Sequence, residues 1–287
     1  MRFVKYHALG NDYLVWEGGP ANFPCDVQSI RLFCDRHRGA GADGLLVGDW
    51  DGQVGQVRIF NPDGSEAEIS GNGVRIFARY LADSGKAAAP GFAVRTPGGD
   101  VWCDLLPDHG IRAALGPAQF NSVNIPLTGP PREVLDEPIT LEDRTLRISA
   151  VGLGNPHCVV MVPRVDRDLA LQLGPVLEWH PLFPQRTNVQ FVEVVDRHTL
   201  RIEIWERGAG YTWSSGTSAS AAAAVAVRLG VAASPIRVRS PGGECQIEID
   251  RGFEVSLAGP VTRVAEITME KNWLADATSH PHTDDHP

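Results

Sequence analysis

The chain has 287 residues, enough for one large domain or two smaller ones. Hydrophobic residues make up 43% and charged residues 21%, ordinary values for a folded protein, which exclude disorder, collagen and coiled coil as descriptions of the whole chain. The formal net charge is −9 and no basic face is concentrated in the sequence, so a nucleic-acid partner is not expected.

In the first half of the chain, residues 54–60 alternate apolar and polar side chains, which predicts a half-buried strand. Residues 71–83 follow with apolar side chains at the spacing of a buried helical stripe, namely Val74, Phe77 and Leu81. Gly85 ends this helix. The Pro-Gly-Gly at 97–99 lies between two strand-like runs and predicts a hairpin turn.

The second half gives the same order of elements. Strands are predicted at 190–195, 199–205 and 236–239, with a second Pro-Gly-Gly turn at 241–243. A helix is predicted at 216–229, ended by Gly230, and it is almost pure alanine. Because its side chains are so small, we expect this helix to lie in a tight core, threaded through a curved sheet.

An internal repeat relates the two halves. Three short segments recur in the same order, each 144 or 145 positions later: Leu9-Gly10-Asn11 as Leu153-Gly154-Asn155, Ser70-Gly71-Asn72-Gly73 as Ser215-Gly216-Thr217-Ser218, and Val94-Arg95-Thr96-Pro97-Gly98-Gly99 as Val238-Arg239-Ser240-Pro241-Gly242-Gly243. A period this long is typical of a duplicated domain and not of a solenoid.

We therefore predict an α+β protein of two pseudo-symmetric domains, each a curved, mostly antiparallel sheet around a central helix. The expected domains are residues 1–116, completed by about 261–272, and residues 117–260. The polar segment 276–287 is predicted to be a disordered tail. Two such domains often enclose a ligand in a cleft, where the helix N-termini after Ser70 and Ser215 would suit a carboxylate.

Seven motifs resemble those of the diaminopimelate epimerase family in order and spacing, over roughly residues 1 to 265. They are His7-Ala-Leu-Gly-Asn-Asp-Tyr13, Asp35-Arg-His37 with Gly41-Ala-Asp-Gly44, Asn61-Pro-Asp-Gly-Ser65, Ser70-Gly-Asn-Gly73, Gly154-Asn-Pro-His157, Thr187-Asn-Val189 and Glu206-Arg-Gly-Ala-Gly210. The resemblance implies an isomerase of α-amino acids that needs no pyridoxal phosphate or other cofactor. It also implies a cleft between two similar domains, a small amino-acid substrate and a homodimer.

The sequence departs from the family at two decisive positions. Family members use two cysteines, one on each face of the α-carbon, where this chain has Ser70 and Ser215. A serine hydroxyl usually needs an adjacent base to become reactive, and both serines are also natural helix N-caps. Tyr211 stands where the family usually has a glutamate, and Trp213 is bulky for its place. These two residues are expected to reshape the edge of the pocket.

The resemblance assigns roles to the remaining positions. Asn11, Asn61, Asn155 and Asn188 match asparagines that hold the substrate away from the reacting carbon. Glu206 and Arg207 match a pair that binds its ammonium and carboxylate groups. Backbone N–H groups at Gly71, Asn72, Gly216 and Thr217 would cradle the reacting carboxylate. The residues that would assist the two serines are His157, as the base for Ser70, and Glu206.

Three functions remain open from the sequence. The first is epimerisation or racemisation of an α-amino acid, with lysine biosynthesis as the implied context. The second is a one-sided proton shift or elimination, as in isomerases and dehydratases of this fold. The third is an inactive amino-acid-binding protein, because both base positions are serine.

Cysteine usage and the chain's apolar runs bear on its compartment. The five cysteines (Cys25, Cys34, Cys103, Cys158 and Cys245) are scattered without a C-x-x-C pair, which favours a reducing compartment. The N-terminus lacks the apolar run of a signal peptide, and the longest apolar stretch, 221–227, is too short to cross a bilayer. We expect a cytoplasmic protein with no membrane contact, and no spacing in the sequence predicts a metal site.

Overall fold

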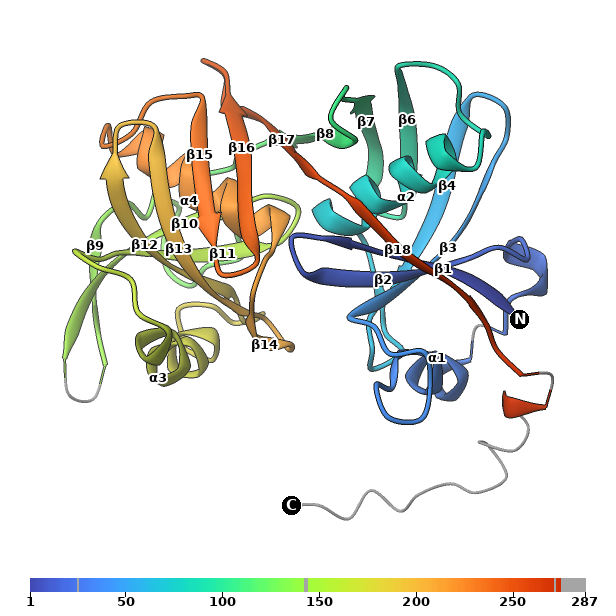
Figure 1. Ribbon diagram of the computed structural model, residues 1–287. Helices are drawn as coiled ribbons and strands as arrows, with labels where there is room; N and C mark the ends of the chain where they lie inside the picture. Colours follow the sequence, from blue (N-terminus) through green and yellow to red (C-terminus); the bar gives the residue numbers. More distant parts are fainter. Residues whose placement is uncertain (25, 142–143, 271, 275–287) are drawn as a thin grey trace, which may run out of the picture.

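The computed structural model describes residues 1–24, 26–141, 144–270 and 272–274. Cys25 and the predicted tail at 276–287 lie outside these residues. The chain forms two lobes, each with strands around one central helix (Figure 1). This confirms the α+β class.

The first lobe contains eight strands in chain order: β1 (Arg2–Ala8), β2 (Asn11–Trp16), β3 (Gly44–Trp50), β4 (Val54–Phe60), β5 (Glu66–Ala67), β6 (Gly91–Thr96), β7 (Gly99–Leu105) and β8 (Gly110–Pro117). Pairing is antiparallel for β1–β2, β3–β4, β6–β7 and β7–β8, and parallel for β2–β3 and β4–β6. The predicted strand at 54–60 and the hairpin at 97–99 are both confirmed.

The second lobe repeats this pattern with β10 (Thr145–Gly152), β11 (Pro156–Met161), β12 (Asn188–Asp196), β13 (Thr199–Glu206), β14 (Gly210–Thr212), β15 (Ile236–Ser240), β16 (Gly243–Ile249) and β17 (Glu254–Pro260). Here too β11–β12 and β13–β15 are parallel, and β10–β11, β12–β13, β15–β16 and β16–β17 are antiparallel. The matching order of parallel and antiparallel pairs supports a duplication of one domain.

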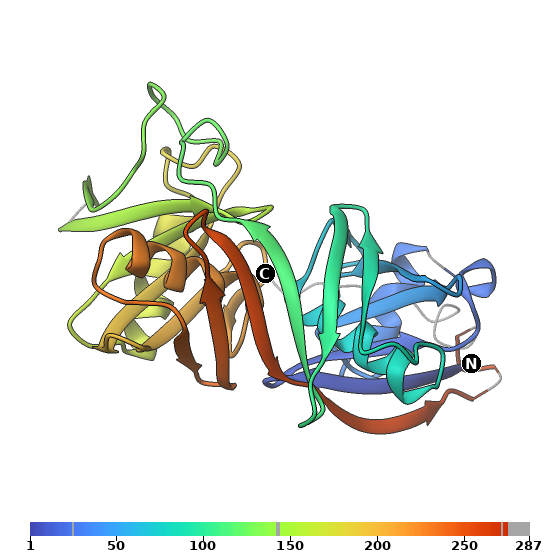
Figure 2. The ribbon, with the colours of Figure 1, turned by 90° about the horizontal axis from the view of Figure 1, so that it is seen from above.

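One strand from the end of the chain joins the first lobe. β9 (Glu137–Thr140) pairs with β10 within the second lobe, whereas β18 (Thr262–Thr268) follows the second lobe and pairs with β1. Between the lobes, β8 and β17 pair antiparallel along their length. Figure 2 shows β18 passing from the second lobe along the outside of the first. The β8–β17 and β1–β18 pairings fix the two lobes to each other through backbone hydrogen bonds.

The two central helices are α2 (Gly71–Asp83) and α4 (Gly216–Arg228), close to the predicted ranges. Within the alanine-rich α4, residues 216–226 are all buried, and the helix contacts β10, β11, β12, β13, β15, β16 and β17. The prediction of a small helix inside a curved sheet is confirmed. The helices end before Gly85 and Gly230, whose φ values of 69° and 74° lie in the left-handed region that glycine adopts readily.

Two further helices cover the outside of the sheets. Neither of them is predicted from the sequence. They are α1 (Val27–Cys34) and α3 (Arg167–Glu178), in addition to the short 3₁₀ turn η1 (Pro20–Asn22). Both begin after an aspartate cap, Asp26 and Asp166. The proposed domain boundary at residues 116 and 117 falls at the end of β8 and stays a prediction. Among the described helices, none is long and apolar enough to cross a membrane.

Candidate active site

The helices α2 and α4 begin in the same way. Ser70 and Ser215 each have an extended backbone, with φ and ψ of −140° and 119° and of −146° and 126°. Each side chain caps its helix: Ser70 Oγ accepts a hydrogen bond from the Gly73 N–H at 3.1 Å, and Ser215 Oγ accepts one from the Ser218 N–H at 3.4 Å. The N-cap role expected for both serines is therefore present in the structure.

The two helix N-termini meet backbone to backbone. A Cβ atom placed on Gly71 would lie 3.5 Å from the Cα of Gly216, and one placed on Gly216 would lie 3.4 Å from the Cα of Gly71. Each N-terminus carries unpaired N–H groups and a partial positive charge of roughly half an elementary charge. Two such ends so close together favour an anion between or beside them.

On the second-lobe side, Glu206 is the last residue of β13, and the Ser215 hydroxyl lies 3.5 Å from Thr217 Oγ1. Burial raises the pKa of the Glu206 carboxyl group, a hydrogen-bonding interaction with Ser215 lowers it in part, and the charge of Asp43 raises it further. A carboxylate with a raised pKa beside a hydroxyl group is suited to accept the proton of that hydroxyl.

On the first-lobe side, Ser70 contacts Tyr13 of β2. The Tyr13 hydroxyl lies 3.1 Å from Ser70 Oγ, and the tyrosine side chain is buried. Burial raises the pKa of Tyr13, so the phenol stays protonated. Tyr13 belongs to the first sequence motif but carried no predicted role, because nothing local connects it with a residue 57 positions away.

His157 has neighbours other than the predicted one. Its Nε2 lies 2.7 Å from Asn155 Oδ1, while Ser70 is hydrogen-bonded to Tyr13 and Gly73. Burial lowers the pKa of His157 to about 3, so the ring is neutral near pH 7. β11 buries the ring in the second lobe, where its polar contact is with Asn155, and the role of His157 as the base for Ser70 stays a prediction.

Three other predicted ligand residues lie on loops or strand ends of the cleft region. The Asn188 amide is occupied by backbone: its Nδ2 donates to Pro156 O at 3.0 Å and its Oδ1 accepts from the Arg207 N–H at 3.0 Å. Asn61 Nδ2 donates to Ser65 Oγ at 2.9 Å, and the half-buried Arg207 donates to Gln185 O at 3.3 Å. Asn188 thus positions Arg207, whose guanidinium group is partly open to solvent.

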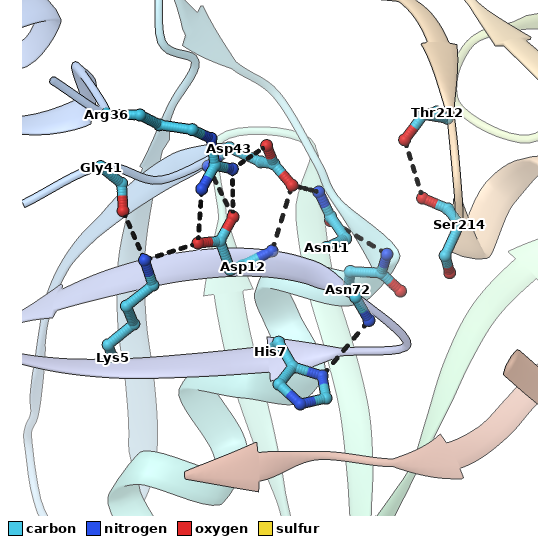
Figure 3. A network of polar contacts seen from close by, with 11 residues as sticks. Lys5, His7, Asn11, Asp12, Arg36, Gly41, Asp43, Asn72, Thr212 and Ser214 are labelled. Carbon is cyan, nitrogen blue, oxygen red and sulfur yellow. Dashed lines mark hydrogen bonds and ion pairs between the residues drawn. The ribbon is translucent and has the colours of Figure 1, made fainter. Parts of the chain in front are cut away.

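Asn11 and Asn72 belong to one continuous network (Figure 3). Asn72 Nδ2 donates to Asn11 Oδ1 at 3.0 Å, and Asn11 Nδ2 donates to Asp43 Oδ2 at 3.1 Å. Behind Asn72, the guanidinium group of the fully buried Arg75 donates to Asn72 Oδ1 at 2.7 Å. The side chains of Asn11 and Asn72 are thereby held in place, and the Asn72 backbone N–H lies in the first turn of α2.

The far end of the network is a cluster of alternating charges. Asp12 is paired with Lys5 at 2.7 Å and with Arg36 at 2.7 Å, and Arg36 also contacts Asp43 at 2.6 Å. Burial alone would raise the pKa of Asp12, but the hydrogen bonds from Arg36 and Lys5 outweigh it and lower the pKa to about 2. The cluster anchors the β1–β2 hairpin, and therefore Asn11 and Tyr13, to the start of β3.

A cavity of about 530 Å³ adjoins this cluster and reaches both lobes. It is lined by Lys5, His7, Gly10, Asn11, Asp12, Arg36, Asp43, Tyr211, Thr212, Trp213 and Val264. Among the predicted ligand residues, Asn11 alone lines it. Tyr211 and Trp213 also line this cavity, and their effect on the substrate pocket stays a prediction.

The described cysteines offer no replacement for the missing pair. Cys34, Cys103, Cys158 and Cys245 are free and buried, and none of them lines the cavity. Burial raises the pKa of the Cys103 thiol to about 12 and that of Cys245 to about 11. Buried thiols of this kind behave as small apolar side chains.

Comparison of the sequence with known families gives a match to the model described as diaminopimelate epimerase, over residues 3–121 and 149–264. The chain is 47% identical over 270 residues to "Diaminopimelate epimerase 2" of Nostoc sp. strain PCC 7120, covering 93% of this chain and 94% of that protein. It is 40% identical over 270 residues to the diaminopimelate epimerase of Stutzerimonas stutzeri, covering 93% and 98%.

Solved structures share the fold at low sequence identity. A hydroxyproline epimerase from Agrobacterium vitis, with trans-4-hydroxy-L-proline bound, has a TM-score of 0.70 at 18% identity, covering 93% of this chain and 91% of that one. A probable proline racemase from Agrobacterium radiobacter K84, with bound carbonate, has a TM-score of 0.71 at 18% identity, covering 99% and 97%. These likenesses extend over both lobes.

Proposed function

The chain belongs to the diaminopimelate epimerase family, and on this premise we propose that it epimerises an α-amino acid of the diaminopimelate type without a cofactor. The observation that carries the proposal is the contact between the starts of α2 and α4, each opened by a serine. Removal of an α-proton places negative charge on the adjacent carboxylate. Helix N-termini that point at this carboxylate stabilise the added charge.

We propose that the substrate's reacting carboxylate binds to backbone N–H groups of the two first turns, at Gly71, Asn72, Gly216 and Thr217. Ser70 and Ser215 then lie at the two ends of the site. Arg207, positioned by Asn188, is proposed to bind the distal carboxylate, with Asn61 and Asn155 as further contacts. Asn11 is proposed to act at the mouth of the site, since it lines the cavity.

The base on the second-lobe side is proposed to be Ser215 acting with Glu206. The α-proton moves to Ser215 Oγ while the Ser215 proton moves to the Glu206 carboxylate, so no free alkoxide is formed. Because the pKa of Glu206 is raised, its carboxylate accepts a proton more readily near neutral pH, which favours this transfer. Activity should fall at acidic pH, beginning above the usual carboxyl range, because protonated Glu206 no longer accepts a proton.

The experiment is proton NMR in D₂O with the purified protein and LL- and meso-diaminopimelate among a panel of amino acids. Loss of an α-proton signal together with appearance of the other stereoisomer supports epimerisation. An alkene or keto acid product would instead indicate the elimination or proton-shift reaction. Unchanged α-proton signals together with binding measurable by calorimetry would indicate an inactive amino-acid-binding protein. Serine at both base positions makes this the second candidate function.

The setting of the enzyme is part of the same proposal. We propose a cytoplasmic homodimer that acts in lysine biosynthesis, supported by the family to which the chain belongs. Sedimentation of the purified protein tests the dimer, and complementation of a lysine auxotroph tests the biosynthetic role.

A further inference from the structure

The hydroxyl oxygen of Ser70 has two polar neighbours within hydrogen-bond distance. The Gly73 N–H donates to Ser70 Oγ at 3.1 Å, and the Tyr13 hydroxyl lies 3.1 Å from the same oxygen. A hydroxyl oxygen accepts two hydrogen bonds and donates one. If both contacts are accepted by Ser70, its own proton is the only part of the group left for a ligand.

The burial of Tyr13 determines which of the two hydroxyl groups donates. Tyr13 is 6% exposed, and within the described residues its hydroxyl has Ser70 as its hydrogen-bond partner. A buried O–H group that donates to nothing loses a hydrogen bond at a cost of about 1–3 kcal/mol. Ser70 has no such loss, because it is half-buried and can donate its own proton to solvent or to a ligand. Tyr13 is therefore the donor and Ser70 the acceptor.

Ser215 has different surroundings. Its Oγ accepts from the Ser218 N–H at 3.4 Å, lies 3.5 Å from Thr217 Oγ1, and interacts with the carboxyl group of Glu206. An ionised carboxylate only accepts, so in the proposed function the Ser215 proton is directed to Glu206. The two serines occupy equivalent positions of the repeat but differ in their partners. One face of the cleft presents a proton and the other face presents a proton acceptor.

We propose that Tyr13 is a positioning residue that fixes Ser70 as the proton donor of the site, opposite Ser215 and Glu206 as the acceptor. This inference rests on the proposed function. In the forward step the α-proton passes to Ser215 and the Ser215 proton to Glu206. On the opposite face the Ser70 proton passes to the α-carbon, while Tyr13 stays protonated and keeps its hydrogen bond to Ser70 Oγ. The substrate loses one proton and gains one, and solvent then returns a proton to Ser70 while Glu206 releases its own.

The test variant is Tyr13→Phe, with Tyr6→Phe as its matched control. Tyr6 is the partner of Tyr13 in the β1–β2 ladder and is also buried, but its hydroxyl donates to Asp83 Oδ2 at 3.0 Å, at the other end of α2. Both variants remove one buried phenol hydroxyl from the same hairpin. Only Tyr13→Phe removes the contact to Ser70.

The readout is the ratio of α-deuterium incorporation to inversion in D₂O, measured separately for each stereoisomer. Without Tyr13, Ser215 still removes and returns a proton on its own face, but donation from Ser70 is impaired. For the stereoisomer whose α-proton faces Ser215, we expect Tyr13→Phe to raise the ratio by about tenfold or more and Tyr6→Phe to leave it unchanged. An equal fall of exchange and inversion in Tyr13→Phe, or no change in either, would overturn the proposal.

A neutron structure of the deuterated protein tests the donor assignment without any turnover. A deuteron on the Tyr13 oxygen, directed at Ser70 Oγ, supports the proposal, and a deuteron on Ser70 directed at Tyr13 overturns it. Because this result does not depend on the substrate, a failure of the proposed function in the exchange assay is distinguishable from a failure of the donor assignment.

Discussion

The backbones of Gly71 and Gly216 lie in contact, with a Cβ on either residue only 3.4–3.5 Å from the Cα of the other. Each glycine is the first residue of its lobe's central helix, so the contact joins the positive ends of α2 and α4. Like partial charges at this distance repel each other, and a bound carboxylate relieves the repulsion. The duplicated helix start thus makes one anion site from two halves of the repeat.

Replacement of both serines by cysteine is expected to raise the rate. The double variant Ser70→Cys, Ser215→Cys should increase α-proton exchange by about tenfold or more, because a thiol titrates near 8.5 and a helix N-terminus lowers that pKa further. The measurement is deuterium exchange by NMR as a function of pH. Ser220→Cys is the control, since Ser220 is a buried residue of α4 away from its start. An unchanged rate in the double variant would show that the serines are not the limiting groups.

His157 should make stability depend on pH. The unfolded chain protonates histidine near pH 6.5, whereas burial holds the pKa of folded His157 at about 3. The unfolded state therefore binds more protons as the pH falls below 6.5, and stability is lost over the interval down to about 3. Between pH 7 and pH 5 this amounts to about 2 kcal/mol.

Urea unfolding of the wild type and of His157→Gln at both pH values measures this contribution. The wild type should lose more stability than the variant between pH 7 and pH 5. The same loss in both proteins would mean that His157 is already protonated in the folded state, or that other groups cause the loss.

Arg75 should depend on Asn72 for the one side-chain hydrogen bond that it makes within the described part of the chain. The guanidinium group is fully buried, donates to Asn72 Oδ1, and has no partner for Nε and Nη1 among the described residues. Asn72→Leu leaves the buried cation without its acceptor and should lower the free energy of unfolding by about 2–3 kcal/mol. Adding Arg75→Met, which removes the charge at similar volume, should recover part of this loss. A double-mutant cycle in urea checks it; additive effects would contradict the coupling.

Trp213 should affect substrate binding and leave stability nearly unchanged. Its side chain is 61% exposed and lines the cavity between the lobes. Trp213→Ala is expected to change the free energy of unfolding by no more than about 0.5 kcal/mol. KM should rise, because the indole ring no longer forms part of the pocket edge, while kcat stays within about twofold of the wild-type value.

Trp102→Ala is the matched control, since Trp102 is 51% exposed on β7 and does not line the cavity. It should leave both kinetic constants unchanged. Equal kinetic effects in the two variants would show that the cavity is not part of the substrate's path.

The sequence by itself determined the features that depend on neighbouring residues and on the repeat. Serine before a Gly-rich helix start predicted both caps, the apolar spacing predicted α2, and the alanine-rich composition placed α4 in a core. The repeated glycines Gly10 and Gly154 also share a backbone conformation, because both have a positive φ. Motif order and spacing were sufficient to identify the family.

Only the tertiary structure decided which groups face each other. Tyr13 lies 57 residues from Ser70 in the chain, and no local pattern brings a strand residue to a particular helix cap. The pairing of β18 with β1 and the neutral, buried state of His157 likewise depend on long-range packing. A repeat in the sequence predicts equivalent backbones, but the side chains around each copy come from different segments. For that reason Ser70 and Ser215 share a cap geometry and differ in their partners.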